Sequence, residues 1–421
     1  MARYVDKHKG FKKLIRVDEA LEIILENLDV VGYEEVFIED ACWRVLYEDL
    51  LSNRDVPPFD RAAMDGYAVR SVDVAGASEN NPIRLRVVGE VRASKLYEGV
   101  VGPMEAVRID TGAPMPEGSD AVVILEDTEF RNGYIDVFRS VSKFGNVSVR
   151  GEDVKRGELL FRRGHLLHPY DVALLKYLGY SRLKVFRKVR VSLASIGNEL
   201  FEVGEDAGES GIIESNRVLI TGVLSRWPVE FMRSVILPDE EEAIQKFISD
   251  SIRDSDLIVT TGGTSLGRGD VMTDYVYSIG DVFFHGVALQ PSKPVLFALV
   301  GGKPFLGLPG YPVAAAISTF MFVEPAIMKM AGVSGSPLYR VVKARLTRRV
   351  ASKLGMLQVV RVKVRKDGDE YLATPVYGSG AGVLSSLSKG DGFLLIPENV
   401  EGYDEGALVD VYMYREVIWD G

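Results

Sequence analysis

Residues 260–270 read Thr260-Thr-Gly-Gly-Thr-Ser-Leu-Gly-Arg-Gly-Asp270, and the apolar residues 257–259 precede them. Glycines let a chain turn sharply and bring backbone N–H groups close to an anion, and the start of a following helix adds partial positive charge. The stretch is therefore either a phosphate-binding loop or a plain tight turn between a strand and a helix. Asp270 would repel a bare phosphate, so it is either the helix N-cap or the partner of a cation bound beside the anion.

Strands and helices alternate on the N-terminal side of this loop. The alternating elements are expected at residues 189–195, 215–226, 229–237, 239–255 and 257–261. Asp239 stands at the expected cap of the second helix, with Glu242 three residues on. Regular alternation at this spacing predicts a parallel sheet with right-handed crossovers, and such sheets bind ligands at the carboxyl ends of their strands.

Two other expected strand ends also carry polar or turn residues. The strand 189–195 leads into Ser195-Ile-Gly-Asn-Glu199, and a strand at 305–308 leads into Pro309-Gly-Tyr-Pro312. Taken singly, Glu199 is explained as a solvated loop acid and Pro312 as a first helical residue. Three strand ends in one sheet that are each followed by polar or turn residues favour a ligand site.

Outside this region, helical patterns and short β-like runs occur in separate segments. Helical patterns cover residues 16–28, 41–50, 151–180 and 312–330. Short β-like runs such as 83–92 and 121–125 occupy residues 57–139, so this segment is expected to be an insertion in a helical unit. After a linker at 332–337, five β-like runs predict a small all-β domain. These runs are 339–350, 357–365, 371–376, 393–397 and 408–414.

Length and composition limit the class of protein. A chain of 421 residues suggests about three domains. The net charge of −10 argues against nonspecific binding to nucleic acid or to an anionic membrane. The single Cys42 forms no internal disulfide, and four scattered histidines give no zinc-ligand spacing. With no signal-peptide pattern and no apolar run of ~18 residues, a cytoplasmic protein is expected.

Five motifs occur in order along the chain. They are Phe59-Asp-Arg-Ala-Ala-Met-Asp-Gly-Tyr-Ala68, Thr111-Gly-Ala-Pro114, Arg150-Gly-Glu-Asp153, Gly262-Gly-Thr-Ser-Leu-Gly267 with Asp270, and Gly307-Leu-Pro-Gly-Tyr-Pro-Val313. Singly, the acids in the first motifs are explained as turn residues that satisfy backbone N–H groups. Together, the motifs closely resemble the molybdopterin molybdenumtransferases, the MoeA and gephyrin E-domain type of molybdenum cofactor biosynthesis.

The resemblance implies a multidomain α/β and β fold in a dimeric protein. The implied parts are an N-terminal α/β linker domain at 1–53 and 140–185, an inserted β-rich domain at 54–139, a molybdopterin-binding α/β domain at 186–332, and a C-terminal β-barrel at 333–421. The central domain, with its parallel sheet, would be similar to the molybdopterin adenylyltransferases. In the family, the active cleft combines this domain of one subunit with N-terminal segments of the other.

The implied reaction is a transfer. Adenylylated molybdopterin and molybdate are taken up, the pyrophosphate linkage is cleaved, and metal-loaded cofactor and AMP are released, with a divalent cation such as Mg²⁺. The implied catalytic residues are Asp65, Glu199, Asp270 and Lys293, and the implied metal ligands are Glu199, Asp239 and Asp270. The implied substrate-binding residues are Thr111, Asp153, Gly262, Gly263, Thr264, Ser265, Pro309, Pro312 and Ser379. The adenylyltransferase of the pathway is a candidate protein partner.

The sequence departs from the family at a few positions. Gln290 stands where many members have lysine, Ser292 replaces a glycine, and Tyr311 replaces an asparagine. Gly355 is followed by Met356, where the family often has arginine. The residues leave molybdate and tungstate open as the oxyanion. Two alternative functions are an adenylyltransferase, against which the extra domains argue, and a non-catalytic dimeric scaffold, against which the retained acids and Lys293 argue.

Overall fold

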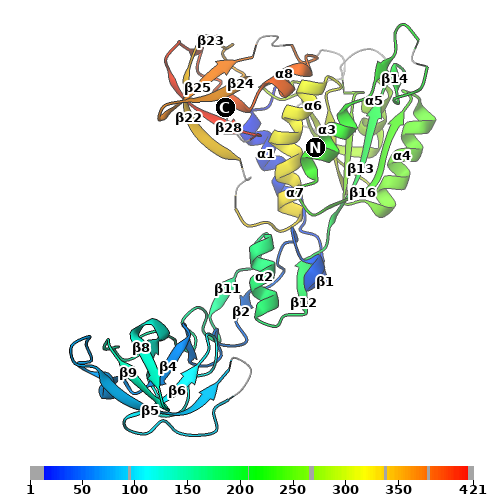
Figure 1. Cartoon of the computed structure of the whole chain (residues 1–421). Coiled ribbons are helices and arrows are strands. Elements are labelled where there is room, and N and C mark those ends of the chain that lie inside the picture. Colours follow the sequence, from blue (N-terminus) through cyan, green and yellow to red (C-terminus); the bar gives the residue numbers. More distant parts are fainter. Residues whose placement is uncertain are drawn as a thin grey trace. The chain divides into compact units, whose positions relative to one another are not determined.

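The structure is a computed structural model that describes residues 14–92, 96–206, 208–264, 270–335, 339–376 and 380–415. The chain folds into two compact units (Figure 1). The large unit comprises Met1–Tyr47, Gly164–Pro169 and Arg182–Gly421, and the small unit comprises Glu48–Arg163 and Tyr170–Ser181. The finer division into four domains stays a prediction.

The large unit contains a six-stranded sheet in the order β16-β13-β17-β21-β20-β18. Its strands are β13 Val189–Ile196, β16 Val229–Leu237, β17 Leu257–Thr261, β18 Gly280–His285, β20 Leu296–Val300 and β21 Lys303–Leu308. The first four strands of this order run parallel, as predicted. Strand β20 runs antiparallel to β21, and β18 runs antiparallel to β20, and the sequence did not predict these two pairings.

Helices cover both faces of this sheet, and each face has its own apolar core (Figure 1). The helices are α3 Asn216–Leu224 and α6 Pro312–Ser318 on one face, and α4 Glu241–Asp254 and α5 Val271–Ile279 on the other. Leu193 of β13 belongs to the first core and its neighbour Ala194 to the second. Because side chains alternate across a strand, strands covered on both faces need nearly continuous apolar sequence.

Helix α4 begins after Glu240, whose carbonyl accepts the Ile244 N–H at 3.1 Å. The prediction that Asp239 caps this helix is therefore wrong. The Asp239 N–H instead donates to Asn198 Oδ1 at 3.0 Å, which holds Asp239 in the preceding loop. Its carboxylate consequently lines the cavity described below.

Helix α6 continues through a π-helical segment, Thr319–Val323, into α7, Glu324–Met330. Contrary to expectation, Pro312–Met330 is long and apolar enough to match a membrane span by length and composition. However, 78% of its most apolar window is buried inside the protein. Phe322 and Val323 belong to the large core, and such burial is typical of a core helix.

The C-terminal part of the large unit is a closed β-barrel. Its strands are β22 Arg340–Leu346, β24 Leu357–Asp367, β25 Glu370–Pro375, β26 Gly392–Ile396 and β28 Leu408–Met413. The ring closes because β24 pairs with both β25 and β26. The short strand β19 (Leu289–Gln290), from the segment before β20, also pairs with β24.

The large unit also contains shorter elements. They are α1 Val17–Glu26, β1 Tyr33–Phe37, β12 Arg182–Phe186, β14 Leu200–Phe201, β15 Ile212–Ile213, β23 Val350–Ala351, β27 Gly402–Tyr403 and α8 Ser385–Lys389. Of these, α1 and β12 contribute residues to the large core. The predicted helix at 41–50 is wrong. Val45 and Leu46 instead form β-bridges with Leu166 and Val185, and Trp43 has a left-handed φ of +62°.

The small unit contains a second six-stranded sheet, in the order β7-β4-β6-β5-β9-β8. Its strands are β4 Gly66–Val69, β5 Ile83–Val91, β6 Glu105–Ile109, β7 Ala121–Ile124, β8 Thr128–Arg131 and β9 Tyr134–Val137. Two-residue or three-residue strands pair beside it: β2 Leu50–Leu51, β3 Arg61–Ala62, β10 Val147–Ser148 and β11 Leu159–Phe161. Of the predicted helical stretch 151–180, only α2 (Pro169–Tyr177) is helical.

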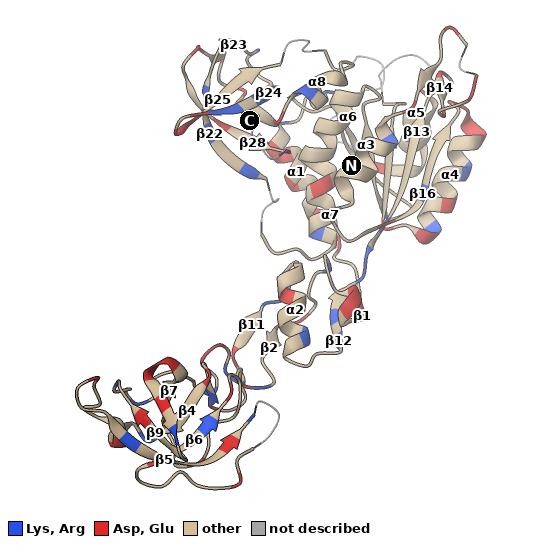
Figure 2. Cartoon of the chain, viewed as in Figure 1, with Lys and Arg blue, Asp and Glu red and all other residues tan. Residues whose placement is uncertain are grey.

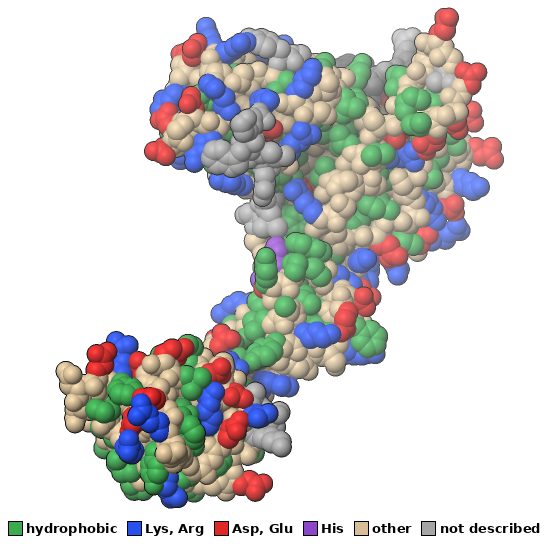
Figure 3. All heavy atoms as spheres, viewed as in Figure 1, with side chains coloured by type: hydrophobic (Ala, Val, Ile, Leu, Met, Phe, Trp, Pro, Cys, Tyr) green, Lys and Arg blue, Asp and Glu red, His purple; other side chains and the backbone are tan. Residues whose placement is uncertain are grey.

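Basic and acidic residues are interspersed over both units (Figure 2). On the face shown in Figure 3, Lys and Arg side chains stand beside Asp and Glu side chains rather than in separate fields. The formal charge of −10 is thus spread over the chain, so an anionic ligand must be held by local groups in a cavity.

Candidate active site

A cavity of about 660 Å³ lies at the carboxyl ends of β13, β17 and β21 in the large unit. Four segments line most of it: the loop after β13, the start of α3, the glycine loop after β17, and the turn before α6. This is the edge at which the sequence predicted a ligand site. Eight predicted site residues line the cavity, among them all three predicted metal ligands: Glu199, Asp239, Gly262, Gly263, Thr264, Asp270, Pro309 and Pro312.

The glycine loop turns sharply at Gly262 and Gly263, which have left-handed φ angles of +80° and +64°. A Cβ atom at Gly262 would lie 2.3 Å from the Ile196 carbonyl oxygen, so only glycine fits there. Thr264 is buried, and its hydroxyl donates to the Leu308 carbonyl at 3.2 Å. The loop is thereby fixed against the neighbouring strand. The predicted substrate-binding Ser265 lies outside the described residues.

Asp270 is the N-cap of α5. Its carboxylate accepts the Thr273 N–H at 3.4 Å, and the Thr273 hydroxyl donates to the Gly263 carbonyl at 2.7 Å. These bonds join the start of α5 to the glycine loop. One of the two readings of Asp270, the N-cap, is confirmed, while its role as a cation ligand stays a prediction.

Two further carboxylates line the cavity: Glu199 from the loop after β13 and Asp239 from the loop after β16. Partial burial raises the pKa of Asp239, and the negative charge of Glu199 raises it further. Asp239 Oδ1 is buried and has no hydrogen-bond partner among the described residues. A positive charge between the two carboxylates would relieve this repulsion. Within the described residues, no three His, Cys, Asp or Glu side chains are grouped to hold a metal ion.

His285 contacts the glycine loop. Its ring is buried, and its Nε2 lies 2.9 Å from the Thr264 carbonyl oxygen. Burial lowers the pKa of His285, although the bond to Thr264 opposes that effect. A neutral ring with its proton on Nε2 is therefore the form that supports the loop. No sequence motif marked this histidine, because the contact joins β18 to a distant loop.

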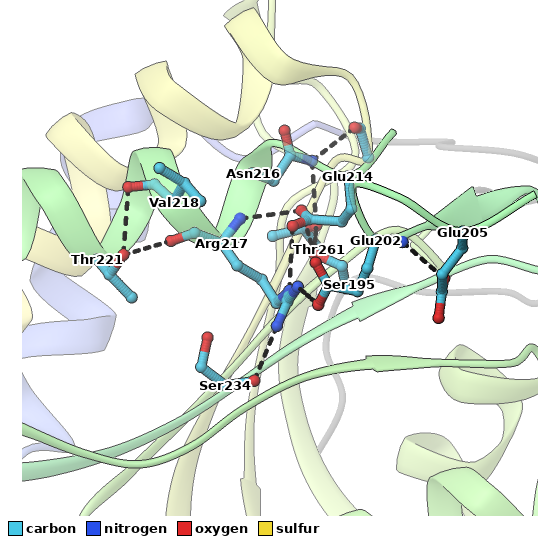
Figure 4. Close-up of polar contacts among 11 residues, drawn as sticks. Ser195, Glu202, Glu205, Glu214, Asn216, Arg217, Val218, Thr221, Ser234 and Thr261 are labelled. Carbon is cyan, nitrogen blue, oxygen red and sulfur yellow. Dashed lines mark hydrogen bonds and ion pairs between the residues drawn. The ribbon is translucent and has the colours of Figure 1, made fainter. Parts of the chain in front are cut away.

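Three residues of the cavity lining, Glu214, Asn216 and Thr261, belong to a buried polar network (Figure 4). The Ser195 hydroxyl donates to Glu214 Oε1 at 2.8 Å and lies 3.2 Å from the Thr261 hydroxyl. Asn216 Nδ2 donates to Thr261 Oγ1 at 3.1 Å and to the Gly310 carbonyl at 2.8 Å. The sequence reasoning did not assign these side chains a role. The string Glu214-Ser-Asn216 at the start of a helix was the signal that could have found them.

Lys293 is exposed and does not line this cavity, although its neighbour Pro294 does. Gln290 lines a smaller cavity of about 270 Å³ together with Arg349 and Arg361 of the barrel. Ser292 has a left-handed φ of +125°, where a glycine is the residue that fits most easily.

The small unit contains three predicted site residues. Asp65 Oδ1 accepts the Thr111 N–H at 2.7 Å and the Thr111 hydroxyl at 2.8 Å, and these bonds lower the pKa of Asp65. Asp153 is exposed, and its N–H donates to the Val56 carbonyl at 3.0 Å. The structure thus brings Asp65 and Thr111 together. The predicted Ser379 lies outside the described residues.

Comparison with known proteins gives matches along most of the chain. Residues 15–179 match a family model described as "MoeA N-terminal region (domain I and II)". Residues 192–329 match one described as "Probable molybdopterin binding domain", and residues 343–414 match "MoeA C-terminal region (domain IV)".

Individual relatives match over nearly their whole length. A Methanocaldococcus jannaschii protein named for molybdopterin biosynthesis is 35% identical and aligns over 97% of this chain and 100% of its own. The molybdopterin molybdenumtransferase of Bacillus subtilis is 32% identical over 96% of this chain and 94% of its own. The crystal structure of the Pyrococcus horikoshii OT3 moeA protein superposes with a TM-score of 0.84 at 33% identity, and covers 96% of this chain and 100% of its own.

Proposed function

Because this chain belongs to the MoeA family of molybdenum cofactor biosynthesis, we propose that it is a molybdopterin molybdenumtransferase. It inserts molybdate or tungstate into adenylylated molybdopterin and releases AMP. The observation that carries this proposal is the cavity at the carboxyl ends of the parallel strands, which is lined by the Gly262-Gly263 turn, the N-cap of α5, Glu199 and Asp239. This arrangement supports the proposal of a phosphate site with a cation beside it.

The cavity suits a substrate that combines phosphates with heterocycles. Its volume of about 660 Å³ lies within the range of small-molecule sites. The backbone at Gly262 and Gly263 can approach a phosphate closely because no Cβ intervenes, and the first N–H groups of α5 add partial positive charge. The chain's own contribution is thus to bind and orient the phosphates.

The carboxylates of Glu199 and Asp239 fit Mg²⁺. Asp239 has a buried oxygen without a hydrogen-bond partner in the described part of the chain, and its pKa is already raised by Glu199. A hard cation prefers oxygen ligands and keeps several waters, so two carboxylates with substrate oxygens suffice. The ion would neutralise charge on the phosphates as the linkage breaks. Asp270, on the glycine-loop side, is the third proposed ligand.

We further propose a homodimer in which Asp65, Thr111 and Asp153 contribute to the partner's cleft, and in which Lys293 holds phosphate or oxyanion. The hydrogen bonds from Thr111 keep Asp65 ionised, which supports a role for its charge. Ser265 and Ser379 complete the proposed substrate-binding set. A cytoplasmic location is proposed on the sequence pattern, and contact with the molybdopterin adenylyltransferase is proposed on the resemblance alone.

Two other functions are less well supported. An adenylyltransferase would need only the central sheet domain, whereas the matches to molybdenumtransferases cover almost the whole chain. A scaffold without catalysis has no need of Glu199, Asp239 and Asp270 around one cavity.

The proposed function is tested by incubating the protein with adenylylated molybdopterin, Mg²⁺ and either molybdate or tungstate, and measuring AMP and the metal content of the product. We expect AMP release that requires one of the oxyanions. Absence of AMP with both oxyanions would contradict the proposal. Consumption of ATP with unmodified molybdopterin would instead support the adenylyltransferase.

A further inference from the structure

Two loops flank the cavity and touch each other at glycines. A Cβ atom at Gly310 would lie 3.3 Å from the Cα of Gly262, and the Gly262 N–H donates to the Leu308 carbonyl at 3.1 Å. The turn that precedes α6 therefore packs directly against the proposed phosphate-binding turn. Any shift of Gly310 would be transmitted to the backbone at Gly262.

Asn216 holds these two loops at a fixed spacing. Its side-chain amide is buried, and its two N–H bonds are used for the Gly310 carbonyl at 2.8 Å and for Thr261 Oγ1 at 3.1 Å. Thr261 is the residue immediately before Gly262. Since a carbonyl oxygen only accepts, the bond to Gly310 fixes which end of the amide is nitrogen.

The donor and acceptor roles of the Ser195 and Thr261 hydroxyls are then determined. The Ser195 hydroxyl gives its hydrogen to Glu214, so in its contact with Thr261 it must accept. The Thr261 hydroxyl is therefore the donor to Ser195, and its lone pair receives the Asn216 N–H. The bonds form a directed chain from Asn216 through Thr261 and Ser195 to the Glu214 carboxylate. Such chains strengthen each of their bonds.

The Glu214 end of this chain is anchored by Arg217 (Figure 4). The Arg217 backbone N–H donates to Glu214 Oε1 at 2.9 Å, and its Nε donates to Oε2 at 3.0 Å. Arg217 Nη1 also donates to the Ser234 carbonyl of β16 at 2.8 Å. The network thus joins β13, β16 and β17 to the turn after β21, through the first turn of α3.

We propose that Asn216 is a positioning residue of the reaction, which sets the distance between the Gly310 turn and the Gly262 turn across the substrate. This inference rests on the proposed function of the cavity. Asn216 touches neither reacting atoms nor cation in this role. It acts through Thr261 and Gly310, so its loss should lower kcat more than it changes KM.

The central test compares Asn216→Asp with the unaltered protein in AMP release at saturating substrates. The substitution keeps the shape, replaces the N–H donors with an oxygen facing the Gly310 carbonyl, and adds an acid to the first turn of α3, where the helix dipole favours it. We expect kcat to fall roughly 10- to 100-fold, since small misplacements have effects of this size. KM should change little. The melting temperature should fall, because a buried oxygen then faces the Gly310 carbonyl, so kcat is measured at a temperature where both proteins are folded.

A second pair of variants separates positioning from stability. Thr261→Val keeps the size of the side chain and removes the hydroxyl that accepts from Asn216, whereas Thr261→Ser keeps the hydroxyl. We expect Val to lower kcat and Ser to restore most of it. Thr221→Val is the matched control, because Thr221 lies on the same helix, its hydroxyl donates to the Arg217 and Val218 carbonyls, and it does not line the cavity.

The outcomes distinguish a failure of the positioning role of Asn216 from a failure of the proposed function. If the unaltered protein releases AMP and Asn216→Asp is equally active, the positioning role is wrong and the proposed function stands. Equal damage by Thr261→Val and Thr261→Ser would also overturn it, as would a loss of kcat in Thr221→Val. An unaltered protein that releases no AMP overturns the proposed function and the positioning role with it.

Discussion

The indole N–H of Trp227 donates to the fully buried carboxylate of Glu324, with 2.7 Å between Nε1 and Oε1. Arg226 forms an ion pair with the same carboxylate, and the Tyr339 hydroxyl donates to its other oxygen. Tyr339 lies one residue before the first barrel strand, so this cluster joins the sheet region to the barrel. Burial, followed by the charge of Glu324, raises the pKa of Tyr339 well above its ordinary value.

We expect Glu324→Gln to destabilise the protein by about 2 kcal/mol, because hydrogen bonds to a charged group are lost inside the protein. Urea unfolding of both proteins measures the difference. Asp410→Asn is the control, since its ion pair with Lys343 is exposed and such pairs contribute roughly 0 to 1 kcal/mol. Equal effects of the two substitutions would show that Glu324 does not stabilise the junction.

Asp270→Asn separates the capping role from the proposed cation role. Asparagine caps helices about as well as aspartate, so the melting temperature should stay unchanged. The lost charge should remove most Mg²⁺-dependent AMP release. A titration of activity with Mg²⁺ is the measurement, and full activity at saturating Mg²⁺ would assign Asp270 to capping alone.

The proposed shared cleft is tested by complementation. Asp65→Asn and Asp270→Asn are each expected to be inactive, because each removes one charge from every cleft of its own homodimer. Mixed heterodimers should regain one intact cleft and partial AMP release. Subunit exchange is demonstrated separately by a tag on one variant. No recovery despite exchange would place both residues in a cleft formed by a single subunit.

His285 should make stability depend on pH. Burial lowers its pKa in the folded protein, so the unfolded chain binds a proton more readily once the pH falls below about 6.5. The contribution of His285 is therefore fully present above that pH and decreases as the pH falls through it. His285→Gln retains a donor for the Thr264 carbonyl and does not titrate. Urea unfolding at pH 8 and pH 5 should show a smaller loss for this variant than for the unaltered protein.

Gln290→Lys tests the departure from the family at that position. Gln290 lines the smaller cavity together with Arg349 and Arg361, so a lysine ammonium at position 290 would increase the positive charge of that cavity. We expect the variant to need less molybdate or tungstate for half-maximal AMP release, through a Coulomb term of ~1 to 4 kcal/mol that shrinks at high salt. Identical oxyanion titrations at low and high salt would exclude Gln290 from the site.

Local sequence patterns were enough to predict the parallel strands and the strand-end position of the site. The strand 257–261 is buried on both faces, so its sequence is mostly apolar. The turn after it has left-handed φ angles, so its sequence has glycines. The five motifs then identified the family. Glu199 and Asp270 were chosen as candidates because they stand next to the strand ends, and both line the cavity.

The remaining features depend on contacts between distant segments. The segment 41–50 has a helical pattern of apolar residues, but Val45 and Leu46 bridge to partners more than a hundred residues away. Asn216 was missed because its partners, Thr261 and Gly310, become neighbours only when the sheet forms. Asp239 was misassigned as a cap because a side chain from another loop, Asn198, takes its N–H.

The pairing of β19 with β24 has a consequence for attempts to divide the chain. The Leu357 N–H donates to the Ala288 carbonyl at 2.8 Å, and Val359 and Phe393 of the barrel belong to the same apolar core as Phe322. A fragment that stops before the barrel would leave an unpaired strand edge and expose that apolar surface to water, and both features promote aggregation. To produce the sheet region as a soluble fragment, the β19 edge and the apolar residues that contact the barrel would therefore have to be redesigned.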